Sequence, residues 1–143
     1  MTNTIHFFTE GITYRLQGKR KLRRWITNTA AEENKITGEI CIIFCDDSYL
    51  RRINRKYLKR NTFTDIITFP MIDQESIIGG DIYISLPRII DNAKRFNQKR
   101  IDELHRVVIH GVLHLIGYND SSEEQKGEMR AKENYYLEQL LLF

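Results

Sequence analysis

The sequence predicts an α+β (or α/β) fold, in which a small mixed β-sheet packs against several helices. Runs of β-branched residues alternate with helical patterns, and together they give the order β-α-β-α-β-β-α-α-α. The chain has 143 residues, 41% of them hydrophobic and 29% charged, which is typical of a globular protein with one core. No repeat, low-complexity tract or Pro/Gly-rich linker divides it. We therefore expect a single domain over residues 1–143.

The first half of the chain contains two predicted strands and two predicted helices. Residues 5–8 form a short apolar run, and residues 39–45 are apolar on both faces, which indicates a central strand. Apolar side chains recur at helical spacing over residues 19–34 and again over 49–58. We expect Thr37-Gly38 to break the first helix. The side chains of the second helix that are predicted to face inward are Leu50, Ile53, Asn54 and Tyr57.

The second half contains two predicted strands and three predicted helices. A loop (59–63) comes first, and it is followed by a strand (64–69) that Pro70 ends and by a connector (71–78). Gly79-Gly80 then begin a second strand (81–85). Three helices follow: one that runs to Phe96, one over residues 98–116, and one that runs to about Leu142. Pro87 suits the first position of its helix, where no N–H is needed. Ser121 and Glu124 have the spacing of a capping box, so we expect them to begin the last helix.

Composition bears on the cellular compartment of the protein and on what it binds. No apolar run is long enough to span a membrane and no signal peptide is visible, so we expect a cytoplasmic protein without membrane partners. Cys41 and Cys45 lie on one face of a strand, too far apart to bridge, and we expect reduced thiols. The net charge of +3 is only mildly basic. Clusters of Lys and Arg within residues 19–24, 51–60 and 88–100 fit either solvated helix faces or an anion-binding surface.

The most informative stretch is His110-Gly111-Val112-Leu113-His114-Leu115-Ile116-Gly117-Tyr118-Asn119-Asp120. Its histidines are four residues apart, so they lie one turn apart on the same face of a helix that is apolar almost all round. Gly117 is suited to end this helix, and the following turn can bring Asp120 back toward the histidines. Two imidazoles and a carboxylate can hold one Zn²⁺ per chain and leave its fourth position for water. The alternative is a pair of hydrogen-bonded core histidines, with Asp120 as a turn or cap residue.

The spacing of this stretch is that of a protease motif, with two differences. Metzincin proteases carry His-Glu-x-x-His-x-x-Gly-x-x-His, and the histidines, the glycine and the last ligand fall here at the same offsets. Asp120 replaces the third histidine, and a carboxylate is an acceptable zinc ligand. Gly111 replaces the glutamate that serves the proteases as general base. A metal site without this base indicates different chemistry.

Three stretches together resemble the YbeY family of bacterial endoribonucleases. The family motif His-Gly-x-Leu-His-Leu-x-Gly-Tyr-Asp-His matches residues 110–120 except at the last two positions, where this chain has Asn119 and Asp120. The family stretch Thr-Asp-Val-Leu-Ser-Phe-Pro is similar to residues 64–70, and Gly-Asp-Ile followed by an apolar strand is similar to residues 80–84. The order and spacing of the three stretches also fit the family.

This resemblance implies a zinc-dependent endoribonuclease that cleaves single-stranded RNA during ribosomal RNA processing. It implies a role in maturation of the 3′ end of 16S rRNA and in ribosome quality control, with ribosomal RNA and the small ribosomal subunit as partners. Carried over by position, the metal ligands are His110, His114 and, in place of the usual third histidine, Asp120. The substrate arginine that the family often carries ahead of the Thr-Asp stretch is replaced here by Leu58.

Cleavage of a phosphodiester builds up negative charge, which a metal ion and nearby cations can neutralise. We expect a zinc-bound water as the nucleophile, with the RNA 2′-hydroxyl as the alternative, and we assign no side chain as general base. The predicted substrate-binding residues are Lys59 and Arg60, which lie beside Leu58, and Arg55 on the preceding helix. Two other functions stay open: a metalloprotease-like hydrolase, and a non-enzymatic, zinc-containing ribosome-assembly factor.

Overall fold

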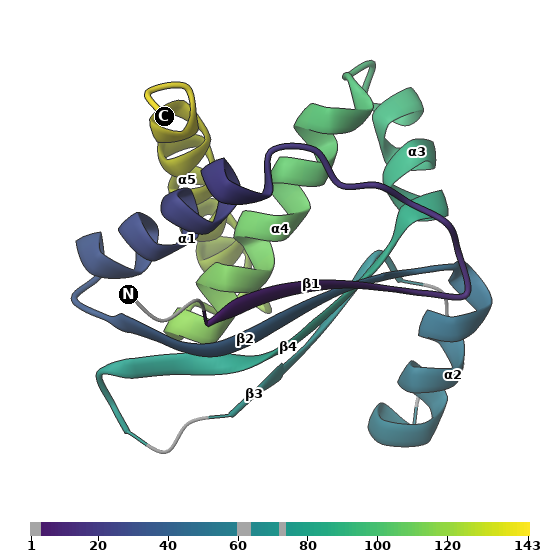
Figure 1. The fold of residues 1–143 in the computed structure, drawn as a ribbon, viewed down its shortest axis with the longest axis horizontal. Helices are drawn as coiled ribbons and strands as arrows, with labels where there is room; N and C mark the ends of the chain where they lie inside the picture. Colours follow the sequence, from purple (N-terminus) through teal and green to yellow (C-terminus); the bar gives the residue numbers. More distant parts are fainter. Residues whose placement is uncertain (1–3, 60–63, 72–73) are drawn as a thin grey trace.

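The centre of the fold is a four-stranded mixed sheet, as the sequence predicts. The structure is a computed structural model, and it describes residues 4–59, 64–71 and 74–143. Strands β1 (Ile5–Glu10), β2 (Ile36–Cys45) and β4 (Ile77–Ser85) run parallel, and β3 (Ile66–Pro70) pairs antiparallel with β4 at one edge. The strand order is β1-β2-β4-β3 (Figure 1). The fold class is therefore α+β, with the predicted order of elements.

The helices in the described part of the chain cover the two faces of the sheet unequally. They are α1 (Lys19–Glu32), α2 (Asp47–Leu58), α3 (Leu86–Arg95), α4 (Arg100–Ile116) and α5 (Glu123–Leu140). Figure 1 shows α1, α4 and α5 on one side of the sheet and α2 on the other. Side chains of β2 alternate accordingly, because Ile42 and Phe44 belong to the main core, whereas Cys45 belongs to a smaller cluster with Leu50 of α2.

Helix α4 lies in the middle of the main core and is apolar almost all round. Its buried side chains contact the sheet, and the helix also packs against α1, α3 and α5. Burial of each large apolar side chain contributes about 1.5–3 kcal/mol, so α4 is held firmly in place. A polar stripe is the exception, and its members recur every three or four residues: Glu103, Arg106, His110 and His114. The core thus presents this stripe at a fixed position beside α5.

The predicted end of the first helix at Thr37-Gly38 is wrong. Helix α1 already ends at Glu32, and Asn34 takes a left-handed conformation with φ of 62°, so Thr37-Gly38 lie inside β2. A Cβ on Gly38 would come within 2.9 Å of Ile77 Cγ2, and the pairing of β2 with β4 shifts register here. The glycine therefore permits a close approach of two strands. As a result, β4 begins at Ile77, inside the segment expected to be a connector.

Two smaller expectations are also corrected. The capping box of α5 is formed by Ser122 and Gln125, one residue later than the expected pair Ser121 and Glu124. Ser122 Oγ accepts from the Gln125 N–H at 3.1 Å, which fixes the start of the helix. Tyr57, expected to face inward, is 56% exposed, because it lies in the last turn of α2 and contacts the sheet by the edge-to-face packing of its ring on Phe69.

Two structural findings bear on the expectations drawn from composition. Within the described ranges, none of the helices combines the length and the hydropathy needed to cross a bilayer. Cys41 and Cys45 are free thiols. Burial, with the charges of Asp46 and Asp47, raises the pKa of the Cys45 thiol to about 12. A thiol with so high a pKa is unreactive near neutral pH.

Candidate metal centre

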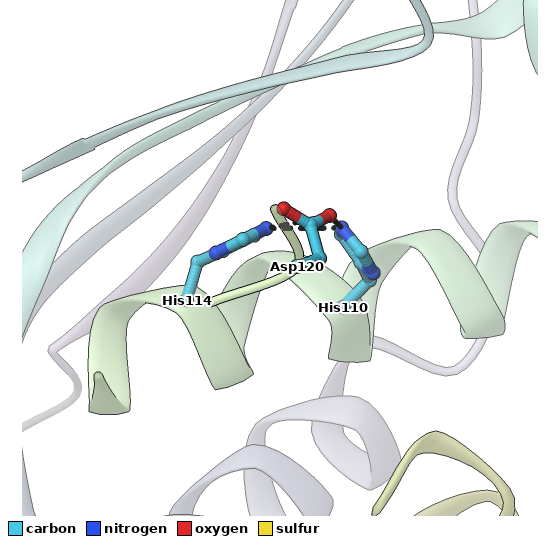
Figure 2. A group of neighbouring side chains, drawn as sticks. All are labelled: His110, His114 and Asp120. Atoms are coloured by element: carbon cyan, nitrogen blue, oxygen red, sulfur yellow. Dashed lines mark hydrogen bonds and ion pairs between the residues drawn. The ribbon is translucent and has the colours of Figure 1, made fainter. Parts of the chain in front are cut away.

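His110, His114 and Asp120 come together at the C-terminal end of α4 (Figure 2). The histidines are one turn apart on the helix, and their Nε2 atoms are 3.0 Å apart. Asp120 follows the helix, and its Oδ2 lies 3.2 Å from His110 Nε2 and 3.4 Å from His114 Nε2. Figure 2 shows both rings pointing toward this carboxylate. Two nitrogens and one oxygen therefore converge, as the spacing of the three residues predicts.

The turn after α4 brings Asp120 back over the helix. Gly117 has a φ of 126°, which favours glycine, and the N–H of Tyr118 donates to the Leu113 carbonyl at 3.0 Å. The Tyr118 hydroxyl donates to Glu33 Oε1 at 2.6 Å, which ties the turn to the end of α1. The predicted role of Gly117 as the end of the helix is confirmed, and the turn places the Asp120 carboxylate beside the histidines.

Hydrogen bonds determine which ring nitrogen of each histidine carries a proton. His110 Nδ1 lies 2.6 Å from Glu133 Oε2, and His114 Nδ1 lies 2.9 Å from the Tyr118 carbonyl oxygen. Carbonyl and carboxylate oxygens accept, so each Nδ1 donates and each neutral ring keeps a lone pair on Nε2. Two lone pairs and a carboxylate oxygen then face one another within 3.4 Å. A bound cation, or a proton shared within the group, would offset the mutual repulsion of these atoms.

The spacing of the three atoms fits a zinc ion. Zinc binds histidine nitrogen and carboxylate oxygen at about 2.0–2.2 Å in a tetrahedron, which places its ligand atoms roughly 3.3–3.6 Å apart. The observed separations are 3.0, 3.2 and 3.4 Å, so small side-chain movements would bring all three atoms to this spacing. Three protein ligands with a fourth position open are typical of catalytic zinc sites. Hydrogen bonds on both Nδ1 atoms are also typical of histidines that bind a metal.

Glu133 of α5 supports His110 from behind. Its side chain is 6% exposed, and it accepts from His110 Nδ1 at 2.6 Å and from Arg106 Nη1 at 2.8 Å. Burial by itself would raise the pKa of Glu133, but these two hydrogen bonds outweigh burial and lower the pKa. Burial also opposes protonation of His110, but the hydrogen bond and charge of Glu133 outweigh it and raise the pKa of His110. Glu133 is therefore ionised and holds the Nδ1 proton of His110.

Replacing Glu133 by glutamine is expected to weaken zinc binding by about 10–100-fold. The amide keeps the shape of the carboxylate but loses the charge that orients His110 and makes its Nε2 a stronger ligand. Competition with a chromogenic chelator measures the affinity. Glu128→Gln, an exposed position on the same helix, is the matched control and should bind zinc as wild type does. Equal affinities of the two variants would contradict this role of Glu133.

A cavity of about 630 Å³ opens beside the three converging side chains. His110 and Asp120 form part of its wall. Further residues of α4 and residues of α3, α5, the start of β3 and the segments just before β3 and just after α3 form the rest. Asp65 lies just before β3 and accepts from Asn92 Nδ2 of α3 at 3.3 Å. Burial raises the pKa of Asp65. The cavity gives a ligand access to His110 from the side of α3 and α5.

Two of the three predicted substrate-binding residues lie away from this cavity. Arg55 lies on α2 and Lys59 is the C-cap residue of that helix, which covers the opposite face of the sheet from α4 (Figure 1). Neither of them lines the cavity beside His110. Arg60 lies outside the residues that the structure describes. Contact of these residues with a substrate stays a prediction.

Two residues of the centre were not predicted from the sequence. Arg106 carried a signal, because it lies four residues before His110 on the polar stripe of α4. Glu133 carried none. Glu133 lies 23 residues after His110 in the sequence, and only the packing of α5 against α4 brings their side chains together.

Gly111, next to His110 in the sequence, packs against the sheet. A Cβ at this position would come within 2.9 Å of Ile66 Cδ1 and of Ile82 Cγ2. A larger side chain would therefore force the core apart. The glutamate of a metalloprotease has no room at this position, so packing as well as sequence excludes the protease base here.

The chain is similar to named proteins over almost its whole length. The family model for endoribonuclease YbeY matches residues 5–141. Relatives named endoribonuclease YbeY include proteins of Cytophaga hutchinsonii, 44% identical over 131 residues (92% of this chain, 92% of the relative), and of Amoebophilus asiaticus, 41% identical over 133 residues (93% and 90%). A solution structure from Thermotoga maritima has a TM-score of 0.63 at 27% identity, and the match covers 95% of this chain and 88% of that one. The chain therefore belongs to the endoribonuclease YbeY family, which confirms the family and the enzyme class that its sequence predicts.

Proposed function

We propose that this chain is a zinc-dependent endoribonuclease that cleaves single-stranded segments of ribosomal RNA precursors. The proposed roles are maturation of the 3′ end of 16S rRNA and ribosome quality control, in the cytoplasm and on the small ribosomal subunit or its precursor. The observation that carries the proposal is the convergence of two Nε2 lone pairs and one carboxylate oxygen within 3.4 Å of one another. Membership of the endoribonuclease YbeY family supports RNA as the substrate. In this proposal residues 1–143 act as one domain.

Each residue of the centre has a distinct task. His110 and His114 would bind the ion through the Nε2 lone pairs and Asp120 through Oδ2, so three protein ligands would hold it. Glu133 and the Tyr118 carbonyl accept the Nδ1 protons and keep both rings oriented. When bound, zinc supplies a Lewis acid that polarises a phosphoryl oxygen and lowers the pKa of a water molecule to about 7.

The structure favours this proposal over the two other functions. A protease would need a general base next to the first histidine, where Gly111 packs tightly against the sheet. A structural zinc is closed by four ligands and often uses cysteine. Within the described residues, the converging group has three members, and the two cysteines lie in β2. An open, catalytic site is the better explanation of three ligands.

The cations of α2 are proposed to bind the RNA backbone outside the cleavage site. The double variant Arg55→Ala with Lys59→Asn is expected to raise KM for a long RNA and leave kcat unchanged, because neither residue lines the cavity at His110. Asparagine tolerates the left-handed φ of 58° at position 59. The slope of log affinity against log salt should fall by about 1.4, since a single strand contributes about 0.7 per phosphate contact. Arg20→Ala with Lys21→Ala removes the same charge from α1 and is the control; an equal salt slope in both double variants would contradict a specific role of α2.

The experiment that tests the proposed function combines metal analysis with two classes of substrate. Protein purified with zinc present is assayed for metal content, then incubated with a single-stranded RNA that spans the 3′ end of precursor 16S rRNA, with the same sequence as a duplex, and with casein. We expect about one zinc ion per chain. Only the single strand should be cleaved, and a chelator should stop the cleavage until zinc is restored.

The possible outcomes separate the three functions. Proteolysis that a chelator stops, without any RNA cleavage, would assign the chain to the protease class. If zinc-loaded protein has neither activity but co-sediments with small ribosomal subunits, the chain is an assembly factor and the nuclease proposal is wrong.

A further inference from the structure

The cavity beside the metal centre has the size and position of a binding site for part of the substrate. Its volume of about 630 Å³ lies within the range of roughly 300–1,000 Å³ that small-molecule sites have. His110 and Asp120 belong both to the converging group and to the wall of the cavity. A group that enters the cavity therefore lies next to the bond that the proposed nuclease cuts.

Phe96 presents an aromatic ring at the wall of this cavity. It is the C-cap residue of α3, and it is 58% exposed although it is large and apolar. The apolar side chains of Ile66 and Val107 line the same cavity. An exposed ring beside apolar wall atoms offers a face on which a planar base can stack, as aromatic side chains do in single-strand-binding proteins.

The charges of the cavity wall favour a base over a phosphate group. The lining carboxylates are those of Asp65, Glu103, Asp120 and Glu133, and the lining guanidinium groups are those of Arg106 and Arg130. Arg106 is already bound to Glu133, at 2.8 Å. Beyond the proposed metal ligands, the wall therefore has no excess of positive charge that would hold a second phosphate. The side-chain carbonyl of Asn92, whose amide nitrogen donates to Asp65, and the amide of Gln98 can pair with the donors and acceptors of a base edge.

We propose that this cavity binds one unpaired nucleobase of the RNA, stacked on Phe96 and hydrogen-bonded at its edge by Asn92 and Gln98. The inference rests on the proposed ribonuclease function and adds to it a base-binding site next to the cut. A base in a duplex is paired and stacked, so it cannot enter the cavity. The site thus selects single-stranded RNA at the nucleotide beside the scissile bond.

The first test measures cleavage with a matched set of variants and substrates. The cut is mapped on a single-stranded oligonucleotide, and each nucleotide flanking it is then replaced in turn by an abasic ribose, which keeps the backbone. Phe96→Ala should lower kcat/KM on the intact RNA by about 5- to 100-fold, mostly through KM, and Phe96→Tyr should restore it because the ring is kept. Phe8→Ala is the control, since Phe8 is a 50% exposed aromatic residue on β1.

The abasic substrates decide whether Phe96 acts on a base. At one position beside the cut, loss of the base should cost the wild type at least as much as Phe96→Ala does, and it should cost the Phe96→Ala variant a smaller factor than it costs the wild type. Zinc content should be equal in all variants. The inference is overturned if Phe96→Ala cleaves as wild type does, or if every abasic substrate loses the same factor in both proteins.

A second test does not depend on cleavage, so it separates this inference from the proposed function. A set of single-stranded oligonucleotides of the same sequence carries the fluorescent base 2-aminopurine, on a 2′-deoxyribose, at each position in turn, so that no mapped cut is needed. Stacking on Phe96 should quench the fluorescence of this base at one position in the wild type and in Phe8→Ala but not in Phe96→Ala. Quenching that depends on Phe96, in a protein that cleaves no RNA, would keep the base site and reject the nuclease. Cleavage without quenching would keep the nuclease and reject the base site.

Discussion

His114→Ala is expected to remove the bound zinc and the RNA cleavage together. His114 contributes one of three converging donor atoms, and its Nε2 lies 3.0 Å from that of His110. Removal of a ligand should lower the zinc affinity by more than the roughly 10–100-fold expected when a hydrogen-bond partner of a ligand is removed. The side chain is 21% exposed, and thermal unfolding of the zinc-free variant checks that the fold is kept. Elemental analysis and the single-strand cleavage assay measure the two effects on the same preparation.

His6→Ala provides the control for this experiment. His6 is a partly exposed histidine on β1 whose Nε2 lies 2.7 Å from Glu39 Oε2, away from α4. An exposed pair of this kind contributes about 0–1 kcal/mol, so the variant should keep its fold, its zinc and its activity. Full zinc content in His114→Ala would show that the converging group is a hydrogen-bonded cluster and not a metal site. His110→Ala should behave as His114→Ala does, with an added loss of stability because Glu133 is left buried with Arg106 as its ion-pair partner.

Asp120→Ala is expected to have the second-largest effect, a loss of zinc affinity of at least about 100-fold together with most of the activity. The carboxylate supplies one of three ligand atoms and the formal negative charge of the converging group. Asp120→His should keep zinc, because an imidazole replaces the carboxylate as a ligand. Asp120→Asn keeps the size of the side chain but loses its charge, so its affinity should lie between those of the other two variants.

Asp120 is 40% exposed, so these variants report on metal binding with little effect on folding. Zinc affinity is measured by competition with a chelator, and thermal unfolding is followed in the zinc-free proteins as a check on the fold. Zinc binding in Asp120→Ala that equals wild type would show that Asp120 only completes the turn after α4. The order His, Asn, Ala in decreasing affinity would establish it as a ligand.

The elements of the fold that the sequence predicted best are those whose pattern is local. Over residues 98–116, apolar side chains surround the helix so completely that its burial follows from the sequence, and α4 spans Arg100–Ile116. A prediction was wrong where the same residue type suits two different structures. Thr37-Gly38 looked like the end of a helix, but Gly38 serves the close approach of β2 to β4, which depends on a strand 40 residues further along the chain.

The sequence by itself determined that His110, His114 and Asp120 come together. An i, i+4 pair on a helix and the turn after Gly117 fix their relative positions within a stretch of about ten residues. The tertiary structure alone decided what surrounds them. Glu133 reaches His110 only through the packing of α5 on α4, and Tyr118 is anchored by Glu33 across 85 residues. The cavity at Phe96 likewise needs α3, α4 and α5 in place. Contacts of this kind arise when distant helices bury their apolar faces together, and the spacing of residues along one segment does not record which faces meet.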